Sequence, residues 1–508
     1  MLQRSARGSL ILVSAQMLST LISAMGTILV ARFLGDTSYG MIFKALVPVH
    51  IAMLFRDIGV GSAITRYTSQ LRHEGKGRVA HSILKTGMGI NLLTGILLSL
   101  IVFFSSGFIA SSIYNDDSLK LLIQIASADI LGMNLMTTSK AVFAGYERME
   151  LHSSMTLIYS VLRSVLSPLL VYYGHGPLGA MVGHTAPIIF TGFLGLAIVI
   201  AYFLGPTDMG YHEAGQRILN YGWPLFLSGV LGGAMTQIYN FLVTVYAETD
   251  MVGNYSAATN FGVLVQFFTL PIATTLFPLF SKLDYRSGGT LKTVYQESVK
   301  YVSLITIPIV IGMAALSEQI INIVYPGYGK ASWFLTLYSL NFLFIGMGSL
   351  GLGNLLNSQD KTGENFRGTI YNVVFSIPLV FILIPRWGVT GLLISQILTK
   401  PGFFRNIWWT WRNMGIAPDW TASAKIYLSA AVAYLSTAIL LSHFHHRNSV
   451  EFIAGGLLLV VVYAAGIVIL GVVDLQDLEN LRTLTRGLGP LSPLFNLLLD
   501  CLRLFLKG

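Results

Sequence analysis

The chain is poor in charged residues and contains one cysteine. Only 11% of its 508 residues are Asp, Glu, Lys or Arg, while 54% are hydrophobic. Soluble domains carry about 25% charged residues, so the deficit excludes a soluble globular protein and indicates a polytopic membrane protein. The single cysteine, Cys501, excludes an intrachain disulfide and gives no metal cluster.

The sequence also lacks the signatures of catalysis. It contains no P-loop, no HExxH or GxSxG motif, and no dinucleotide fingerprint after a strand. Without a P-loop the chain cannot be an ATP-driven pump on its own, and no outer loop is long enough for a catalytic domain. We therefore expect no enzymatic activity, no metal and no cofactor. The net charge of +9 follows the pattern of membrane topology, so we expect no nucleic-acid partner.

Long apolar runs fill most of the chain. A membrane-spanning helix needs about 20 mainly apolar residues, and a span must satisfy its backbone polar groups internally. The expected fold class is therefore an all-α polytopic membrane protein with about fourteen transmembrane helices. The candidate spans are 8–31, 41–62, 82–106, 119–142, 153–173, 178–204, 221–246, 256–279, 298–316, 332–355, 367–385, 388–409, 425–443 and 451–473.

Basic residues are distributed unevenly between the connections. If the N-terminus is cytoplasmic, the inner segments hold 24 of the 32 Lys and Arg residues, the outer turns hold five, and three fall within spans. Because Lys and Arg are enriched in cytoplasmic loops, this predicts a multi-pass protein of the cell membrane with both termini in the cytoplasm.

The chain shows signs of internal duplication. Segment 158–179 shares six identities in 22 positions with segment 370–391, including Gly176 with Gly388, and Gly40 matches Gly253. Six spans separate the copies, which predicts two parallel six-helix lobes with a site between them. The expected organisation is an N-lobe at 1–205, an interfacial linker at 206–220, a C-lobe at 221–412, two further helices at 413–473 and a cytoplasmic amphipathic tail at 474–508.

A few ionisable residues lie inside these spans, where a charge is costly unless it faces protein or water. Arg163 is near the middle of span 153–173, and its planar guanidinium suits a phosphate group. An ion pair with Asp129, in span 119–142, is the alternative. Lys44 and Arg56 in span 41–62 are further phosphate-binding candidates, although Asp57 could neutralise Arg56.

The second half of the chain has no charge at comparable depth. It offers only polar candidates for a cavity, namely Gln237, Asn240 and Asn341. We therefore expect the anionic group of a substrate to bind in the first lobe.

Several short motifs together resemble the polysaccharide biosynthesis (Wzx-type) flippases of the multidrug/oligosaccharidyl-lipid/polysaccharide exporter superfamily. They are RFLG at 32–35, YG at 39–40, DIG at 57–59 with Ala63 and Arg66, VGNY at 252–255 with Ala257 and Ala258, LFP at 276–278 and IPRWGVTG at 384–391. The resemblance covers nearly the whole chain. The seventh span departs from it, because many relatives carry an acidic residue where this chain reads Gln237-Ile-Tyr-Asn240.

The resemblance implies two lobes that alternate between inward-open and outward-open states. It implies a cargo of polyprenyl-phosphate- or pyrophosphate-linked oligosaccharide, moved from the cytoplasmic to the outer leaflet for surface polysaccharide or glycoprotein glycan assembly. The expected partners are this cargo, membrane lipid and glycan-assembly enzymes.

Two other functions stay open from the sequence. A cation-coupled multidrug exporter of the same superfamily would need an acidic residue deep in a lobe, for which Asp129 is the only good candidate. A membrane-embedded glycan polymerase or ligase would be expected to carry a sizeable outer loop with catalytic Arg or His, and none is visible.

Overall fold

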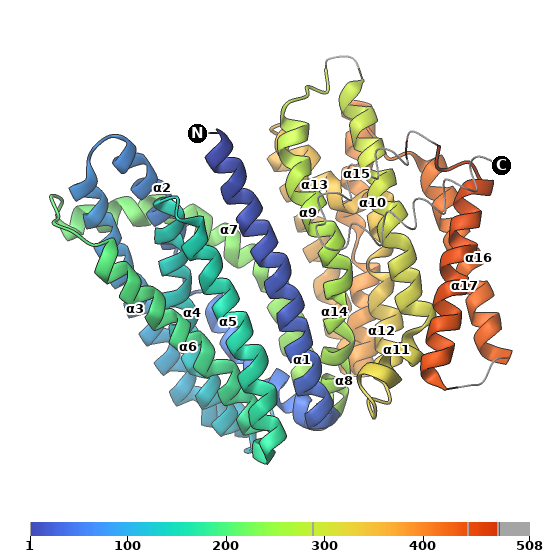
Figure 1. Cartoon of the computed structure of the whole chain (residues 1–508), viewed down its shortest axis with the longest axis horizontal. Coiled ribbons are helices and arrows are strands. Elements are labelled where there is room, and N and C mark those ends of the chain that lie inside the picture. The colour runs from blue at the N-terminus through green and yellow to red at the C-terminus, as the bar shows by residue number, and fades with distance from the viewer. Residues whose placement is uncertain (1, 287–288, 444–446, 475–476, 478–508) are drawn as a thin grey trace. The chain divides into compact units, whose positions relative to one another are not determined.

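The protein is described from a computed structural model that covers residues 2–286, 289–443, 447–474 and 477 (Figure 1). The described residues form helices and connecting turns, without a strand. Their contacts divide the chain into two compact units. Unit 1 comprises residues up to Asn260 together with Ile384–Val389, and unit 2 comprises Phe261–Leu383 and the residues from Thr390 onward.

Unit 1 is built around α4, which packs against α3 on one side and α6 on another. Its core includes Ile64, Ile83, Phe143 and Val199, all fully buried. The helices are α1 (Leu2–Met53), α2 (Val60–His73), α3 (Gly77–Phe108), α4 (Leu119–Gly145), α5 (Met149–Leu170), α6 (Gly176–Tyr202), α7 (Tyr211–Tyr246) and α8 (Thr249–Asn260), with π-helical turns η1 (Ile109–Ile113) and η2 (Val171–His175).

Unit 2 has α10 near its centre, in contact with α9, α12 and α16. The last two helices, α16 and α17, lie side by side (Figure 1). Its helices are α9 (Gly262–Ser281), α10 (Thr290–Ala315), α11 (Ser317–Val324), α12 (Ala331–Leu340), α13 (Ser349–Ser358), α14 (Thr362–Leu398), α15 (Pro401–Met414), α16 (Trp420–His443) and α17 (Asn448–Ile469), with the 3₁₀ turn η3 (Leu343–Met347).

The number of transmembrane helices is compatible with the predicted fourteen. In the described residues, nine helical segments are long and apolar enough to cross a membrane, or ten with the bent pair Ala331–Met347 and Ser349–Ser358. Three of them, Ile11–Met53, Met149–Tyr202 and Thr362–Met414, are 43, 54 and 53 residues long. At 1.5 Å per residue each is about 65–80 Å, roughly twice the 30 Å hydrocarbon core, so each can hold two spans.

Glycines with unusual backbone angles break these long segments. Gly35 inside α1 has φ 76° and ψ 170°, a conformation that a side chain would strain. Gly176 and Gly388 adopt nearly the same conformation, with φ 55° and ψ −143° at Gly176 and φ 53° and ψ −128° at Gly388. These two glycines are equivalent in the predicted duplication, so the duplicated segments turn at the same point in the same way.

The second predicted span ends earlier than expected. Span 41–62 was predicted as one helix, but α1 ends at Met53 and α2 begins at Val60. Gly59 has φ 75°, and Asp57 Oδ1 accepts a hydrogen bond of 3.1 Å from the Gly61 amide in the first turn of α2. Arg56 and Asp57 therefore lie in a tight turn between two helices, because the Asp–Ile–Gly sequence ends one helix and starts the next.

Two further segments differ from the predicted boundaries. Much of the segment 206–220, predicted as an interfacial linker, belongs to α7, whose 36 residues extend about 54 Å. Span 256–279 is interrupted at Phe261, between α8 and α9. The predicted lobes stay a prediction, and the predicted tail at 474–508 lies outside the described residues except for Asp474 and Asp477.

Two glycines allow α1 and α8 to cross at backbone distance. A Cβ atom on Gly40 would lie 1.9 Å from the carbonyl oxygen of Thr249, and a Cβ atom on Gly253 would lie 1.8 Å from the carbonyl oxygen of Asp36. Gly40 corresponds to Gly253 in the duplication, and at the same offset Asp36 corresponds to Thr249. The two contacts are therefore the same contact made once by each copy of the repeat.

We expect Gly253→Ala to destabilise the protein, because the added methyl group cannot fit against the α1 backbone. Overpacking of this kind costs about 1–3 kcal/mol. The melting temperature of the purified protein in detergent should fall, and Gly40→Ala should have the same effect from the other side.

Gly229→Ala is the matched control in α7 of the same unit, since a Cβ atom there would meet no atom within 4 Å. Alanine should leave the melting temperature unchanged or slightly higher, because it favours helix. Equal melting temperatures for the Gly253 and Gly229 variants would show that the close crossing is not a constraint.

A buried polar network in unit 2 joins Asp477 to α10. Lys300 Nζ donates to Asp477 Oδ2 at 2.6 Å and the Tyr301 hydroxyl donates to Oδ1 at 2.9 Å. The amide of Asp474 donates to Oδ2 at 2.9 Å. Burial by itself raises the pKa of Asp477, but the hydrogen bonds from Lys300, Asp474 and Tyr301 outweigh it and hold this pKa below its ordinary value.

This lowered pKa predicts a pH-dependent contribution to stability. A carboxyl group with a lower pKa in the folded state stabilises the fold above its unfolded pKa, near 4, and loses that effect as the pH falls through the folded value. Asp477→Asn should therefore cost about 1–3 kcal/mol at pH 7. Melting curves of both proteins should converge below about pH 4.

The control is Asp208→Asn, whose ion pair with Arg78 spans 3.6 Å between side chains that are 52% and 66% exposed. Exposed ion pairs contribute about 0–1 kcal/mol to stability, so at pH 7 the melting temperature of this variant should be close to that of the unchanged protein. If the difference in melting temperature between Asp477→Asn and the unchanged protein stayed constant down to pH 3, the stabilising role of the Asp477 carboxylate would be contradicted.

Candidate functional site

Lys44 is buried on α1 of unit 1, close to Tyr114. Its side chain is 6% exposed, and its Nζ lies 5.9 Å from the centre of the Tyr114 ring. The carboxylates of Asp116 and Asp250 act on it electrostatically. Lys44 is twelve residues from Arg56, about 18 Å along a helix. These two predicted phosphate-binding residues therefore do not form one site.

Arg163 lines a small cavity of about 80 Å³ among α1, α5, α6 and α8. Hydroxyl groups dominate its polar lining, from Ser23, Thr27, Tyr39, Ser164, Ser167 and Ser256. Ser164 and Ser167 donate to backbone carbonyls at 2.9 and 3.0 Å. Among the described residues Arg163 forms no ion pair. The cavity is small beside the 300–1,000 Å³ of typical ligand pockets.

Asp129 pairs with a histidine that the sequence analysis did not single out. His184 Nε2 on α6 lies 3.2 Å from Asp129 Oδ2 on α4, and the Asp129 side chain is 1% exposed. Neither carboxylate oxygen has a hydrogen bond of good geometry. The ion pair between Arg163 and Asp129, which the sequence left open as an alternative, is not formed among the described residues, and His184 lies beside the carboxylate instead.

A second histidine belongs to the same region. His50 on α1 is close enough for His184, Asp129 and Arg163 to act on it electrostatically. We name these four residues the His–Asp cluster. Both histidines fall within predicted spans, 41–62 and 178–204. An ionisable side chain inside a span is itself a signal of function, so the sequence contained the information that would have identified them.

Three basic side chains gather where α1, α4 and α5 approach one another. Arg56 acts electrostatically on Lys140, and Lys140 acts on His152. Arg56 Nη1 and His152 Nδ1 are buried without a hydrogen-bond partner. The turn that carries Arg56 is fixed by Thr94, whose hydroxyl donates to the Arg56 carbonyl at 3.2 Å. We name the two cations Arg56 and Lys140, with the neighbouring imidazole of His152, the cation cluster.

The cation cluster has little negative charge to compensate it. Asp57 acts on Arg56 electrostatically, but its Oδ1 is used to cap α2, and no ion pair joins them within the described chain. Like charges placed together in a partly buried site repel and lose hydration. An anion bound among them would relieve both costs, and Arg and Lys are the residues that bind phosphate best.

The predicted polar residues lie in both units. In unit 1, Gln237 Oε1 is buried without a partner, and the backbone carbonyl of Asn240 accepts a hydrogen bond from the Thr244 hydroxyl at 2.9 Å. In unit 2, Asn341 Nδ2 is buried without a partner, just after the end of α12. The unpartnered amides of Gln237 and Asn341 each have capacity for a polar ligand or water.

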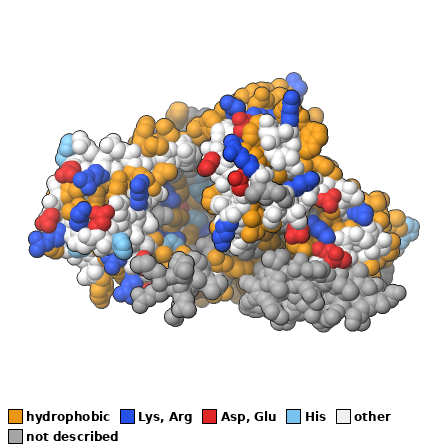
Figure 2. Space-filling view, turned by 90° about the horizontal axis from the view of Figure 1, so that it is seen from above, with side chains coloured by type: hydrophobic (Ala, Val, Ile, Leu, Met, Phe, Trp, Pro, Cys, Tyr) orange, Lys and Arg blue, Asp and Glu red, His pale blue; other side chains and the backbone are white. Residues whose placement is uncertain are grey.

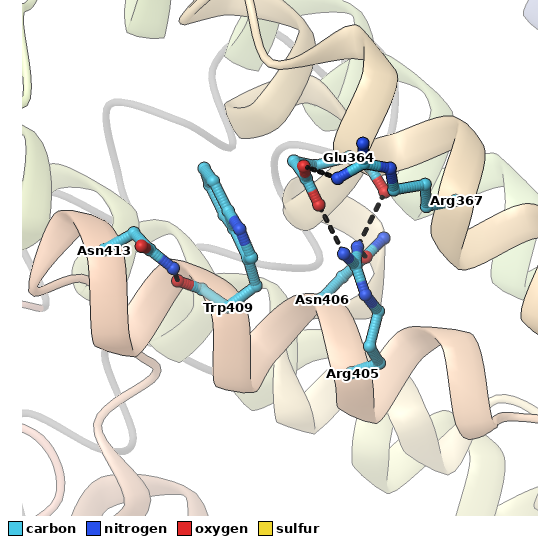
Figure 3. A network of polar contacts seen from close by, with 6 residues as sticks. All are labelled: Glu364, Arg367, Arg405, Asn406, Trp409 and Asn413. Carbon is cyan, nitrogen blue, oxygen red and sulfur yellow. Dashed lines mark hydrogen bonds and ion pairs between the residues drawn. The ribbon is translucent and has the colours of Figure 1, made fainter.

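Two arginines of unit 2, one on α14 and one on α15, are paired with the same acid. Glu364 forms ion pairs with Arg405 and, at 2.6 Å, with Arg367 (Figure 3). Arg405 Nη1 also donates to the Glu364 carbonyl at 3.1 Å and to Asn406 Oδ1 at 3.0 Å. Arg405 thereby joins α15 to α14, whereas Arg367 pairs with Glu364 within α14. Both arginines have an acidic partner, which distinguishes them from the cation cluster of unit 1.

Acidic and basic side chains are interspersed over one end of the helices, as Figure 2 shows. Exposed ion pairs of unit 1 include Arg78 with Asp208, Arg148 with Glu150 and Arg217 with Glu213. Several surface charges of unit 1 are therefore locally paired, whereas the cation cluster is, among the described residues, a half-buried group of unpaired positive charges.

Comparison with known proteins agrees with this arrangement. The family model "Polysaccharide biosynthesis protein" matches residues 5–284, and the model "Lipid II flippase MurJ" matches residues 190–463. The probable low-salt glycan biosynthesis flippase Agl15 of Haloferax volcanii is 22% identical over 403 residues, covering 78% of this chain and 80% of the relative. The lipopolysaccharide biosynthesis protein WzxC of Escherichia coli K12 is 20% identical over 389 residues, covering 73% of each.

Solved structures share the fold. The lipid II flippase MurJ in its inward closed conformation superposes with a TM-score of 0.73 at 17% identity, covering 90% of this chain and 98% of that one. An inward-facing multidrug resistance MATE family transporter gives a TM-score of 0.59 at 14% identity, covering 80% and 98%. Because a family model matches more than half of its length, the chain belongs to the polysaccharide biosynthesis (Wzx-type) flippase family of the multidrug/oligosaccharidyl-lipid/polysaccharide exporter superfamily.

Proposed function

We propose that the protein is a flippase that moves a polyprenyl-phosphate- or pyrophosphate-linked oligosaccharide from the cytoplasmic to the outer leaflet by alternating access. The observation that carries this proposal is the cation cluster, which gathers three basic groups with two buried unpartnered nitrogens. One relative is named a probable glycan biosynthesis flippase and another a lipopolysaccharide biosynthesis protein, and both names support the same cargo class.

In this proposal the cation cluster receives the phosphate group of the cargo. Arg56 offers a planar guanidinium that can donate two parallel hydrogen bonds to phosphate oxygens, and Lys140 adds a second charge. Gln237, in the same unit, supplies an amide group for a sugar hydroxyl, while the polyprenyl chain stays in the lipid. Arg163 is a second phosphate contact, which the phosphate group of the cargo reaches after it leaves the cation cluster during transport.

The His–Asp cluster has a separate role in the proposal. Asp129 and His184 form a titratable pair in the interior of unit 1, so proton uptake or release there changes the local charge beside Arg163. We assign to it the coupling of transport to protons. This also supplies the acidic residue that a cation-coupled exporter needs and that the seventh span lacks.

The distribution of basic residues supports a cytoplasmic location for both termini, and the cargo class supports a location in the cell membrane. Enzymes that assemble or consume the lipid-linked glycan are the expected partners. The relatives are transporters rather than catalysts, which supports a protein without enzymatic activity.

Arg56→Gln and Lys140→Gln should each reduce transport about 10- to 100-fold, because each removes a charged contact to phosphate worth about 1.5–3 kcal/mol. Arg163→Gln should also reduce transport, without loss of protein from the membrane. The measurement is the sidedness of lipid-linked oligosaccharide in cells, where cargo should accumulate on the cytoplasmic leaflet.

The matched control is Lys120→Gln, which removes an exposed cation at the other end of unit 1 and should leave transport unchanged. Membrane-inserted protein is quantified for every variant. Normal export by both the Arg56 and Lys140 variants would refute the assignment of the cation cluster.

Asp129→Asn should make transport insensitive to protons. In proteoliposomes, an imposed pH gradient should accelerate cargo movement by the unchanged protein. The Asp129→Asn and His184→Gln proteins should move cargo at the same rate with and without the gradient. Asp117→Asn, which changes an exposed carboxylate in an outer turn, should respond to the gradient normally.

A double-mutant cycle on thermal stability tests the pairing itself. Asp129→Asn and His184→Gln should be coupled by about 0.5–3 kcal/mol, whereas Asp129→Asn and Arg163→Gln should add with little coupling. The reverse pattern would mean that Arg163, not His184, is the partner of Asp129.

A further inference from the structure

A lateral groove of unit 1 lies outside both clusters described above. It has a volume of about 240 Å³ and is lined by residues of α3, α4 and α6. Its walls are almost wholly apolar and include Met88, Leu92, Leu196 and Ile200. Leu92 and Ile200 are 38% and 54% exposed, so the groove opens to the surroundings of the protein.

The groove exists because α3 and α6 both pack extensively against α4 and have no comparable contact with each other. The face of α4 that carries Leu135, Thr138, Ser139 and Val142 forms the floor. These positions recur at helical spacing. Gly89 on α3 lines the groove, and a Cβ atom there would meet nothing within 4 Å.

Nearly all the polar atoms of the groove are already satisfied. The Thr138 hydroxyl donates to the Asn134 carbonyl at 2.7 Å and accepts from Asn91 at 2.8 Å. The Ser139 hydroxyl donates to the Leu135 carbonyl at 2.9 Å. These hydroxyls have little capacity left for a sugar, so the groove is not suited to a glycan.

Lys85 is the one charged residue that lines the groove. It is half-buried and forms no ion pair within the described residues. The charged neighbour on its own helix, Arg78, is engaged with Asp208. An ammonium group at one end of an apolar groove, without an acidic partner, is complementary to a ligand with one negative charge and a hydrocarbon chain.

We propose that this groove binds an anionic phospholipid of the surrounding membrane, with its phosphate at Lys85 and one acyl chain along α4 between α3 and α6. Within a bilayer, apolar contacts alone do not select one lipid from another. Selection therefore depends on the charge of Lys85, as it does in other basic pockets between transmembrane helices. The proposal does not depend on which cargo the protein transports.

Native mass spectrometry of the full chain tests this site, with titrations of phosphatidylglycerol and of phosphatidylcholine with the same acyl chains. The unchanged protein should prefer phosphatidylglycerol. Lys85→Gln should weaken phosphatidylglycerol binding about five-fold and remove the preference, while Lys85→Arg should retain it. Gly89→Leu should fill the groove and remove one bound lipid of either kind.

Two matched controls separate this site from general effects. Lys120→Gln removes an exposed lysine elsewhere, and Gly312→Leu changes a glycine of α10 whose Cβ atom would also meet nothing. Both should bind lipid as the unchanged protein does. A phosphatidylglycerol preference that survives both Lys85→Gln and Gly89→Leu would overturn the proposal. It would also be overturned if a polyprenyl phosphate displaced phosphatidylglycerol from this site at equal concentration, since the occupant would then be a cargo lipid.

Discussion

The backbone contact between α1 and α8 at Gly40 and Gly253 is the constraint on which unit 1 depends. It places the two helices closer than any side chain would allow, and in a membrane such close packing replaces the hydrophobic driving force that water supplies to soluble proteins. Asp36 and Asn254 reinforce the crossing with a hydrogen bond of 3.1 Å. Because α1 carries His50 and leads into the turn with Arg56, this contact also fixes one wall of the His–Asp cluster and the approach to the cation cluster.

The two units handle their positive charges differently. In unit 2, Glu364 pairs with Arg367 and Arg405, and Asp477 pairs with Lys300. Lys400 is the exception, because it is half-buried and forms no ion pair among the described residues. In unit 1, Arg56, Lys140 and Arg163 have no acidic partner within 4 Å in the described structure. Unpaired buried charge destabilises the folded protein, and binding of an anionic group would offset this loss of stability. Three such cations in unit 1 support the proposal that this unit binds the phosphate group of the cargo.

Much of this architecture follows from the sequence, and the parts that do not have physical reasons. Hydropathy identified the apolar segments because a bilayer demands length and composition, and Gly176 with Gly388 correctly marked equivalent breaks. The turn at Arg56 was missed because it is made by Asp57 and Gly59 within an otherwise apolar run. Arg163 is a candidate because of its depth in a predicted span, and its role stays a prediction. The partner of Asp129 could not be predicted, since it depends on how α4 and α6 pack. His184 could have been identified from the sequence, because it is an ionisable residue within a predicted span.

The reciprocal contact of Gly40 and Gly253 also bears on the origin of the chain. If one copy of the repeat once existed as a separate protein, the same glycine would have met its own counterpart in a second molecule, as in any two-fold dimer. Every substitution there would have altered both sides of the contact at once. Joining the copies in a single chain released each side to change independently. The two copies could then acquire different charged residues, which the identical subunits of a symmetric dimer cannot do.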